Sequence, residues 1–348
     1  MIQHKKYTLT VIDICQETVD CKTIKFKQPN LRKIKYCAGQ YLSLIFLING
    51  RLYVRPYSFS SAPSVDSTLD ITVKKVQNGI VSSYITDKLE VGDVIEVLEP
   101  MGNFKYNIPI NKTIYLWGAG SGITPLFSII KEVLNTNQNT SIHLIYGNKN
   151  QDSVIFNKQI SQLQKDYSSV FSVTYFYSQE ETVRSSQDFY PGRITSNFVT
   201  SLLTQNTLIK ESVHYICGPS DLKDKIKNTL LKLEIPSSSI YTEEFKLNID
   251  EREFDNVKYS QVTIFFEGGG AEFFVPKGKS ILDVALDNDI AIPYSCQTGN
   301  CNTCKGRLKT GQLKMLGKPK EIGCLEQNEY LLCCSYPLTD KVSIELTK

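Results

Sequence analysis

Four cysteines near the C-terminal end constrain the fold of this sequence more than any other feature. Cys296, Cys301 and Cys304 lie on one short stretch, and Cys333 follows in a later segment. This C-x4-C-x2-C…C spacing is typical of the ligands of a [2Fe–2S] cluster. Gly299 permits the positive φ angles with which such a loop can fold its amides around the sulfides. Three ligands would therefore share one loop, and the fourth must come from elsewhere in the fold.

A zinc site is the main alternative interpretation of these cysteines. Cys301 and Cys304 alone would form a zinc knuckle, but the sequence has no second Cys-x2-Cys pair. Cys333 and Cys334 are adjacent, and neighbouring residues of an extended segment point to opposite sides. Such a pair is poorly suited to hold one ion jointly, so we expect the iron–sulfur cluster.

Composition and charge narrow the class of protein. A chain of 348 residues with 41% hydrophobic residues is long enough for two or three domains, each with its own core. The net charge of +3 is too small to indicate a nucleic-acid partner. We find no signal peptide and no run long enough to span a membrane, so we expect a cytoplasmic protein without a membrane partner. The six cysteines outside the cluster set show no paired framework, which fits a reducing compartment.

The first hundred residues predict a small antiparallel β-barrel. Short alternating or apolar runs are separated by turns at the spacing that such barrels have. The expected strands span residues 7–12, 23–26, 41–46, 69–73 and 94–97, and a helix is expected at residues 82–89. We place this first domain at residues 1–108.

After Pro109 the pattern changes to an alternation of strands and helices. The expected strands span residues 113–117, 141–146, 171–176 and 212–217, and the expected helices span residues 126–134, 154–167 and 220–233. Such alternation predicts a parallel sheet with helices on its faces. We place this α/β nucleotide-binding domain at residues 109–247.

The remaining residues predict a linker and a third, smaller domain. Residues 248–256 are charged and lack an apolar pattern, so we expect them to form the linker. In the third domain, residues 257–348, two strands pair across a glycine turn and a helix follows them. The expected strands are 262–266 and 271–275, the turn is Gly268–Gly270, and the helix is 280–288.

Arg55-Pro56-Tyr57-Ser58 is the first candidate binding site. An arginine and hydroxyl groups can neutralise a pyrophosphate, and an aromatic ring at the same strand end can stack on a flat ring. A strand with a surface arginine is the alternative interpretation. A second group of small, polar and basic residues follows in the sequence and supports the binding interpretation: Lys74, Gly79, Ser82 and Ser83.

The segment from Gly118 to Pro125, Gly-Ala-Gly-Ser-Gly-Ile-Thr-Pro, is the second candidate site. Glycines let a turn approach a phosphate closely, and the N-terminus of the following helix offers amides and a partial positive charge. The segment is neither a Walker loop nor a G-x-G-x-x-G motif, and a tight turn that binds nothing is the alternative. Cys217-Gly218-Pro219 is the third candidate, at a strand end where open α/β sheets bind ligands. A buried cysteine there can also be a small apolar filler.

These segments together resemble the ferredoxin–NADP reductase superfamily. The R-x-Y-S and G-x-x-S pair resembles its flavin-binding barrel, and the Gly118–Pro125 loop resembles its nicotinamide-dinucleotide loop. Residues 257–348 resemble a β-grasp ferredoxin domain, including the lead-in Lys277–Asp283 and the closing Cys333-x3-Pro337. The match covers essentially the whole chain. Its domain order resembles reductase components of the phenylacetyl-CoA epoxidase and ketosteroid hydroxylase type.

The resemblance implies roles for individual residues. Arg55 and Ser82 would bind the FAD phosphates, with Tyr57 and Ser58 at the ribityl chain and isoalloxazine ring. Thr124 would lie near the nicotinamide. Lys74 lies at a position where the family often has a basic residue. The alternative interpretation is a solvated lysine on a strand without a binding role. The implied cofactor-binding residues are Arg55, Pro56, Tyr57, Ser58, Lys74, Gly79, Ser82, Ser83, Gly118, Gly120, Ser121, Gly122, Thr124, Pro125, Lys149, Cys217, Gly218, Pro219, Glu243 and Phe245.

The segment Tyr241–Phe245 resembles the part of the family that closes over the flavin, with Glu243 as the family carboxylate and Phe245 near the ring. Cys217 would border the reacting carbon of the nicotinamide. We assign the catalytic positions to Tyr57, Ser58, Cys217 and Glu243. The implied cluster ligands are Cys296, Cys301, Cys304 and Cys333. The family pattern favours Cys333 over Cys334, and Cys324 is a less suitable substitute.

The sequence leaves the choice between NADPH and NADH open. Lys149 and Arg184 are candidate cations for a ribose 2′-phosphate, but Ser178-Gln179 stands where relatives often carry Ser-Arg. The histidines are too dispersed to form a metal set, and we expect no catalytic role for them: His4, His143 and His214.

We therefore predict a three-domain flavoenzyme with an antiparallel β-barrel, an α/β parallel-sheet domain and an α+β ferredoxin domain. It would be an NAD(P)H-dependent oxidoreductase that passes electrons from the nicotinamide through FAD and the [2Fe–2S] cluster to a protein acceptor, an oxygenase or hydroxylase component. A general ferredoxin or flavodoxin reductase is the nearest alternative. A non-catalytic redox sensor and a zinc-binding interaction module are others. The intact Gly118–Pro125 loop argues against the sensor.

Overall fold

The structure is a computed structural model that describes residues 4–29, 33–107, 113–137, 139–180, 189–204, 209–247, 249–317 and 325–346. Its contacts divide the chain into two compact units. Unit 1 consists of Met1–Lys6, Ser43–Pro56 and Phe245–Lys348, and unit 2 consists of Tyr7–Leu42 and Tyr57–Glu244. No helix among the described residues is long and apolar enough to cross a membrane.

The first domain is an antiparallel half-barrel, as predicted. Within unit 2, four of its strands lie in the order β6-β1-β2-β5, and β2 pairs antiparallel with both β1 and β5. β3 and β4 are hydrogen-bonded neighbours, and most of their residues belong to unit 1. The strands are β1 (Lys6–Thr18), β2 (Cys21–Phe26), β3 (Tyr41–Ile48), β4 (Arg51–Ser58), β5 (Leu69–Lys74) and β6 (Val94–Leu98).

The barrel helix α1 spans Ile80–Asp87, two residues earlier at each end than predicted. Asn78 has a φ of 60° and reverses the chain just before it. Gly79 is the extended N-cap residue, so that Ser82 already lies within the helix. The turn at residues 76–79 therefore decides where the helix begins.

A parallel six-stranded sheet forms the second domain, also as predicted. Its order is β10-β9-β8-β7-β11-β12. The chain starts at β7, adds β8, β9 and β10 on one side, and then adds β11 and β12 on the other. The strands are β7 (Ile114–Ala119), β8 (Ile142–Asn148), β9 (Phe171–Tyr177), β10 (Phe189–Pro191), β11 (Val213–Cys217) and β12 (Ile240–Glu243). The order reverses between β7 and β11, and the crevice at such a point is where open α/β sheets bind ligands.

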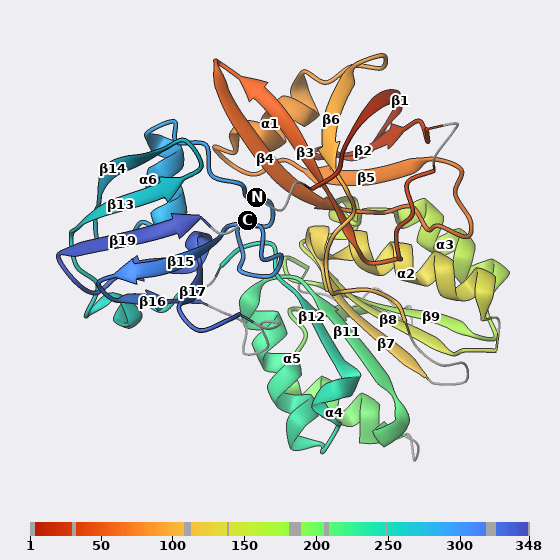
Figure 1. Cartoon of the computed structure of the whole chain (residues 1–348). Coiled ribbons are helices and arrows are strands. Elements are labelled where there is room, and N and C mark those ends of the chain that lie inside the picture. The colour runs from red at the N-terminus through yellow and green to blue at the C-terminus, as the bar shows by residue number, and fades with distance from the viewer. Residues whose placement is uncertain are drawn as a thin grey trace. The chain divides into compact units, whose positions relative to one another are not determined.

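Helices cover both faces of this sheet (Figure 1). Ile114 and Leu116 of β7 pack with α2 and α3 on one face, whereas Tyr115 and Trp117 pack with α4 and α5 on the other. Alternate residues of a strand point to opposite faces, which explains the near-continuous apolar run of β7. The helices are α2 (Ile123–Thr136), α3 (Asn157–Asp166), α4 (Ser196–Thr204) and α5 (Ser220–Lys232).

The third domain lies in unit 1 and has a mixed five-stranded sheet in the order β14-β13-β19-β15-β17. β13 pairs parallel with β19 and antiparallel with β14, and α6 (Ile281–Asp287) packs against β14. A capping box between Ser280 and Asp283 begins that helix. The strands are β13 (Ser260–Phe266), β14 (Gly269–Val275), β15 (Lys305–Thr310), β17 (Glu329–Leu331) and β19 (Lys341–Leu346), with a separate pair of β16 (Leu313–Met315) and β18 (Ser335–Pro337).

The hairpin turn of this domain differs from the prediction. Gly269 and Gly270 pair with Phe266 and Phe265 and so belong to β14. The turn is formed by Glu267 and Gly268 instead, and Gly268 has the positive φ of 91° that a tight turn needs. Only the first glycine of the triplet therefore acts as the turn residue.

Short 3-10 turns connect several elements: Gly120–Gly122, Gln151–Ser153, Ile209–Glu211, Ser237–Ser239, Glu251–Phe254 and Leu332–Cys334. The turn Glu251–Phe254 lies in the stretch that the sequence predicts as a linker. A capping box between Asp250 and Glu253 stabilises it, and the Phe254 ring packs edge-on against Tyr336 with 5.2 Å between ring centroids. This part of the stretch is therefore packed on the third domain.

Candidate functional site

The first site is the cysteine loop of unit 1, which the chain folds tightly through left-handed residues. Gly299 has a φ of 77°, as predicted, and Gln297 and Asn302 also have positive φ angles, both 57°. The loop aims its amides at sulfur: Thr298 N and Asn300 N donate to the Cys296 Sγ at 3.4 and 3.3 Å. Such amide donors stabilise a thiolate, which is the form that binds metal.

The four predicted ligands come together from two segments. The Cys333 thiol, on the turn Leu332–Cys334, makes hydrogen bonds with the Cys296 and Cys304 thiols, and Cys301 makes one with Cys296. The hydrogen bonds from Cys301 and Cys333 lower the pKa of Cys296. Those same bonds raise the pKa of the Cys301 and Cys333 thiols. Thiols that share hydrogen bonds in this way can bind metal ions once they lose their protons.

The pattern fits a two-iron cluster, in which each iron takes two of the four cysteine sulfurs. Among the described residues, no group of three or more His, Cys, Asp or Glu is arranged around one metal ion. Cys334 donates to the Leu331 carbonyl at 3.4 Å. Cys333 and Cys334 lie in a 3-10 turn, so the prediction that this segment is extended is wrong. Besides Cys296 and Cys304, the Cys333 thiol also contacts Cys334. Cys324 lies outside the described residues.

Within unit 1, two buried contacts join β3 and β4 to the residues that precede the cysteine loop. The Tyr294 hydroxyl accepts a hydrogen bond of 3.0 Å from Val54 N, and the Ser43 and Ser295 hydroxyls lie 2.7 Å apart. Cys296 follows Ser295 directly, and Arg55 follows Val54. Sequence reasoning missed these contacts, because Tyr294 and Ser295 belong to no motif.

The second site is the R-x-Y-S segment, which forms the end of β4. Arg55 lies with its guanidinium over the Tyr53 ring, 5.7 Å from the centroid, and Nη1 donates to the Val54 carbonyl at 2.8 Å. Ser58 is buried, and Pro56 and Tyr57 are half-buried. The arginine is thus held in one orientation by its own strand, and its guanidinium carries further N–H donors.

The other predicted flavin residues lie in unit 2, on the first turn of α1 and the end of β5. Ser82 Oγ accepts from Val76 N at 3.1 Å, and a Cβ on Gly79 would lie only 2.4 Å from that oxygen. Gly79, Ser82 and Ser83 therefore form a compact helix start, where backbone amides suit a phosphate. Lys74 forms an ion pair of 3.6 Å with Asp20, which favours the alternative interpretation of a surface lysine.

The third site lies at the carboxyl ends of β7, β11 and β12. Gly118, Cys217 and Glu243 are neighbours across these strands, because Cys217 is in register with both of the others. The loop after β7 contains Gly120, with a φ of 52°, and its carbonyl accepts a hydrogen bond from the Tyr146 hydroxyl. The structure thus brings together three segments that are far apart in sequence.

Gly122 is the point of closest approach in this site. A Cβ there would lie 2.1 Å from the Cys217 carbonyl oxygen and 2.9 Å from Gly218 N. Only glycine lets the start of α2 reach the end of β11. Thr124 Oγ1 donates to the Ser121 carbonyl at 3.0 Å and fixes the first turn of the helix, while Ser121 and Pro125 flank Gly122 and Thr124 in the loop.

Cys217 is fully buried, and its pKa is raised, first by burial and then by the Glu243 carboxylate. A thiol in this state is a poor nucleophile. Lys223 of α5, which sequence reasoning missed, is also buried and forms an ion pair with Glu244. Glu244 N in turn donates to Glu243 Oε1 at 3.1 Å. A cation and two carboxylates therefore lie beside the Cys217–Gly218–Pro219 strand end.

Three predicted residues remain: Lys149, Phe245 and Arg184. Lys149 is exposed after β8, and its carbonyl accepts from Gln179 N at 2.9 Å, so the two segments discussed for the 2′-phosphate are adjacent. Phe245 is half exposed and belongs to unit 1. Arg184 lies outside the described residues.

Three family models match consecutive parts of the chain. They are an oxidoreductase FAD-binding domain at residues 8–106, an oxidoreductase NAD-binding domain at residues 116–228 and a 2Fe-2S iron-sulfur cluster binding domain at residues 264–338. Each model falls within the domain in which the corresponding candidate residues lie.

Relatives match along the whole chain. One subunit of the 1,2-phenylacetyl-CoA epoxidase of Escherichia coli is 30% identical, with 97% of both chains covered. The ferredoxin reductase component of the 3-ketosteroid-9-alpha-monooxygenase of Rhodococcus rhodochrous is 28% identical, over 97% of this chain and 96% of the relative. Among solved structures, phthalate dioxygenase reductase has the same fold, with a TM-score of 0.67, 21% identity and 98% of both chains covered.

Proposed function

This chain belongs to the family of oxidoreductases that join an FAD-binding domain, an NAD-binding domain and a 2Fe-2S domain in one polypeptide, and we propose that it is the reductase component of a multicomponent oxygenase. It is an NAD(P)H-dependent oxidoreductase with FAD and a [2Fe–2S] cluster as cofactors. The observation that carries the proposal is the end-to-end likeness to the reductase component of a monooxygenase and to a component of an epoxidase.

The three carriers explain why one chain needs three domains. A reduced nicotinamide gives up two electrons as hydride, FAD accepts them as a pair and releases them one at a time, and the cluster carries one electron. The protein has to hold the donor against the flavin and to hold the cluster where a partner can reach it. The proposed partner is a protein electron acceptor, an oxygenase component.

We propose that the dinucleotide is bound at the carboxyl ends of β7 and β11. The loop Gly118–Pro125 offers amides at the start of α2, and Gly122 lets that loop lie against Cys217 and Gly218. We propose no nucleophilic role for Cys217 there, since its thiol is buried and its pKa is raised. Glu243, in register with Cys217, supplies a carboxylate at this strand end.

The FAD would be held by the end of β4 and by the first turn of α1. Arg55 supplies a charge for the phosphates, and Gly79, Ser82 and Ser83 supply helix-start amides. Tyr57 and Ser58 line the same strand end. We leave Lys74 out of the phosphate site, because it already pairs with Asp20.

The cluster ligands that we propose are Cys296, Cys301, Cys304 and Cys333, whose thiols share hydrogen bonds. We also propose the domain limits 1–108, 109–247 and 257–348, with 248–256 as the connection. A cytoplasmic location is supported by the nine described cysteines, none of which forms a disulfide.

The visible spectrum of the purified protein tests the proposed function. We expect flavin bands with an additional iron–sulfur shoulder, and bleaching of both after anaerobic addition of NADH or NADPH. Whichever dinucleotide bleaches the spectrum faster is the donor. Cytochrome c, a one-electron acceptor, should then be reduced at the expense of the same dinucleotide. A protein without iron and without extractable flavin after mild reconstitution would contradict the proposal.

A further inference from the structure

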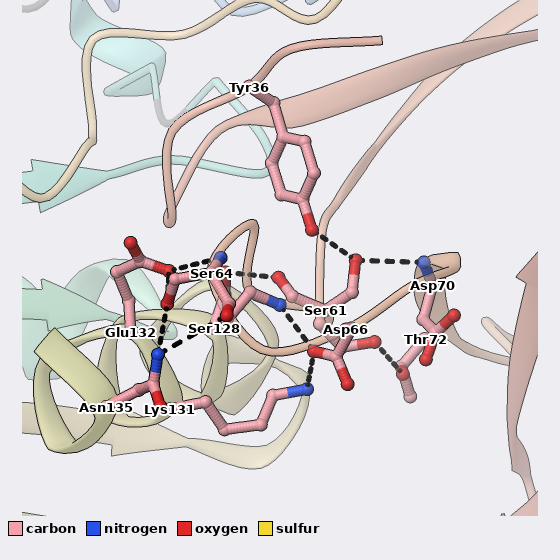
Figure 2. Close-up of polar contacts among 12 residues, drawn as sticks. Tyr36, Ser61, Ser64, Asp66, Asp70, Thr72, Ser128, Lys131, Glu132 and Asn135 are labelled. Carbon is pink, nitrogen blue, oxygen red and sulfur yellow. Dashed lines mark hydrogen bonds and ion pairs between the residues drawn. The ribbon is translucent and has the colours of Figure 1, made fainter. Parts of the chain in front are cut away.

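One face of α2 contacts the barrel segment that follows β4. Four polar residues of the helix at positions i, i+3, i+4 and i+7 lie on this face: Ser128, Lys131, Glu132 and Asn135. They bind three residues of the barrel segment: Ser61, Ser64 and Asp66. We call these seven residues the α2 clasp (Figure 2). All of them belong to unit 2.

The inner part of the α2 clasp is shielded from water. Ser128 Oγ donates to the Ser61 carbonyl at 2.5 Å, and both residues are fully buried. Lys131 Nζ forms an ion pair of 2.5 Å with Asp66 Oδ2, and the Lys131 side chain is only 14% exposed. The ammonium also lies 5.0 Å from the centroid of the Phe127 ring. A mostly buried ion pair of this kind is screened less by salt than a surface pair.

The outer part of the α2 clasp repeats the connection at the surface. Ser64 donates from both N and Oγ to Glu132 Oε2, at 3.1 and 2.8 Å. Asn135 Nδ2 donates to the carbonyl and the Oγ of Ser64, at 3.3 and 3.1 Å. The barrel segment is therefore bound by two consecutive turns of the helix.

The barrel side of the α2 clasp is itself fixed to the half-barrel. Ser61 Oγ accepts from the Tyr36 hydroxyl at 2.7 Å and from Asp70 N at 3.0 Å (Figure 2). Asp66 Oδ2 also accepts from Ala62 N at 2.6 Å, so the carboxylate that binds Lys131 closes a turn of its own segment. A movement of α2 would therefore be transmitted to the strands of the barrel.

Both sides of the α2 clasp are continuous with proposed cofactor sites. Ser61 lies three residues after Ser58, which we place at the flavin. Ser128 follows Thr124 and Pro125 of the dinucleotide loop, on the same helix. The clasp thus joins the two sites through short pieces of backbone.

We propose that the α2 clasp sets the position of the dinucleotide loop relative to the flavin, and that Lys131, Asp66, Glu132 and Ser64 are positioning residues for hydride transfer. This inference depends on the proposed function. In the step concerned, one C–H bond of the reduced nicotinamide would break and one N–H bond would form on the flavin. The hydrogen carries both electrons of the broken bond, which leaves an oxidised nicotinamide and a reduced flavin. The rate depends strongly on the distance and angle between the two rings.

The test is anaerobic stopped-flow measurement of flavin bleaching by the preferred dinucleotide in the full-length protein. Lys131→Glu places two carboxylates against each other, so we expect the rate at saturating donor to fall at least about fivefold. The dissociation constant of the oxidised dinucleotide should stay the same, because the loop Gly118–Pro125 is intact. The charge swap Asp66→Lys/Lys131→Glu should recover only part of the rate, because Asp66→Lys also removes the acceptor of the hydrogen bond from Ala62 N.

Lys232→Glu is the matched control, because it reverses an exposed lysine at the C-terminal end of α5. If Lys131→Glu loses flavin or unfolds, the milder Ser64→Ala/Glu132→Gln variant of the outer part tests the same idea, with a smaller loss of rate expected. Variants that keep their flavin and bleach at the wild-type rate would overturn the inference. A wild-type protein that neither dinucleotide bleaches would instead contradict the proposed function.

Discussion

His214 has a fixed tautomer and a strongly perturbed pKa. The Trp117 indole N–H donates to its Nδ1 at 3.2 Å, and its Nε2 lies 2.9 Å from Ser212 Oγ. Because Nδ1 accepts a hydrogen bond, the proton of the neutral ring is on Nε2 and is donated to Ser212. Burial lowers the pKa of His214 to about 3. The ring also stacks on Tyr115, with 5.2 Å between centroids.

This lowered pKa predicts a loss of stability in acid. The unfolded chain binds a proton at His214 near pH 6.5, whereas the folded chain does so only near pH 3. Between these values the unfolded state holds more protons, so this residue lowers the free energy of unfolding by up to about 1.4 kcal/mol per unit of falling pH. Replacement with asparagine should remove this part of the slope. Urea unfolding at several pH values, followed by fluorescence of the single tryptophan, measures it.

His4→Asn serves as the control, because His4 contacts Thr303 within unit 1, whereas His214 belongs to unit 2. This variant should leave the slope of the wild-type protein unchanged. Equal slopes for His214→Asn and the wild-type protein would show that His214 does not stay neutral in the fold.

At the residue scale, the sequence predicts a residue's conformation where that conformation restricts the residue type. The cysteine loop needs a residue with a positive φ, which favours glycine, and Gly299 has a φ of 77°. The same reasoning does not find Lys223, because a lysine in a charged helix is normally solvated. Burial of Lys223 follows only from the packing of α5 at the end of β11. Likewise, the pairing of Lys74 with Asp20 depends on the β2–β5 register, which no motif encodes.

At the scale of elements, the contact of α2 with β11 predicts that Gly122 cannot be replaced by a larger residue without cost. Gly122→Ala would place a Cβ 2.1 Å from the Cys217 carbonyl oxygen, so either the helix start or the strand end must move. We expect a loss of roughly 1 to 3 kcal/mol in the free energy of unfolding and a weaker affinity for the dinucleotide. Chemical unfolding and titration with the oxidised dinucleotide measure the two effects.

Gly147→Ala is the matched control in the same sheet, since the nearest atoms to its Cβ lie at 3.6 Å or beyond. It should change neither stability nor dinucleotide affinity by much. If both alanine variants behave alike, the close approach at Gly122 does not limit the fold.

The elements that the sequence predicts best are those with a long apolar pattern. The strands β7, β8, β9 and β11 lie within one or two residues of their predicted ends, because each carries an apolar run that packs in the core. β10 and β12 escape prediction, since they have only three and four residues. α4 escapes it because Ser and Thr are common in this helix, and these residues have low helix propensity. Periodicity cannot identify such elements, and the neighbouring strands and helices stabilise them instead.

At the scale of the whole molecule, the proposed hydride site and the cluster thiols lie in different units. Gly118, Cys217 and Glu243 belong to unit 2, whereas the four cysteines of the cluster belong to unit 1. Unit 1 also contains most of β3 and β4, through the contacts of Val54 with Tyr294 and of Ser43 with Ser295. The sequence predicts three domains in order, but it cannot predict that a barrel hairpin packs with the cluster domain, because such packing depends on pairs distant in sequence.

Because the proposed hydride site and the cluster cysteines belong to different units, we expect FAD still to be reduced by the dinucleotide when the cluster is lost. Cys301→Ser removes one proposed ligand, so iron and acid-labile sulfide should be lost from the purified protein. Reduction of ferricyanide by the dinucleotide should stay within about twofold of the wild-type rate, because FAD can serve this acceptor directly. Reduction of cytochrome c should fall by about tenfold or more if the cluster is its route.

Cys334→Ser is the control, since a serine can still donate to the Leu331 carbonyl and the iron should remain. If Cys301→Ser keeps its flavin but loses ferricyanide reduction, hydride transfer depends on the cluster domain and the two halves are not separable.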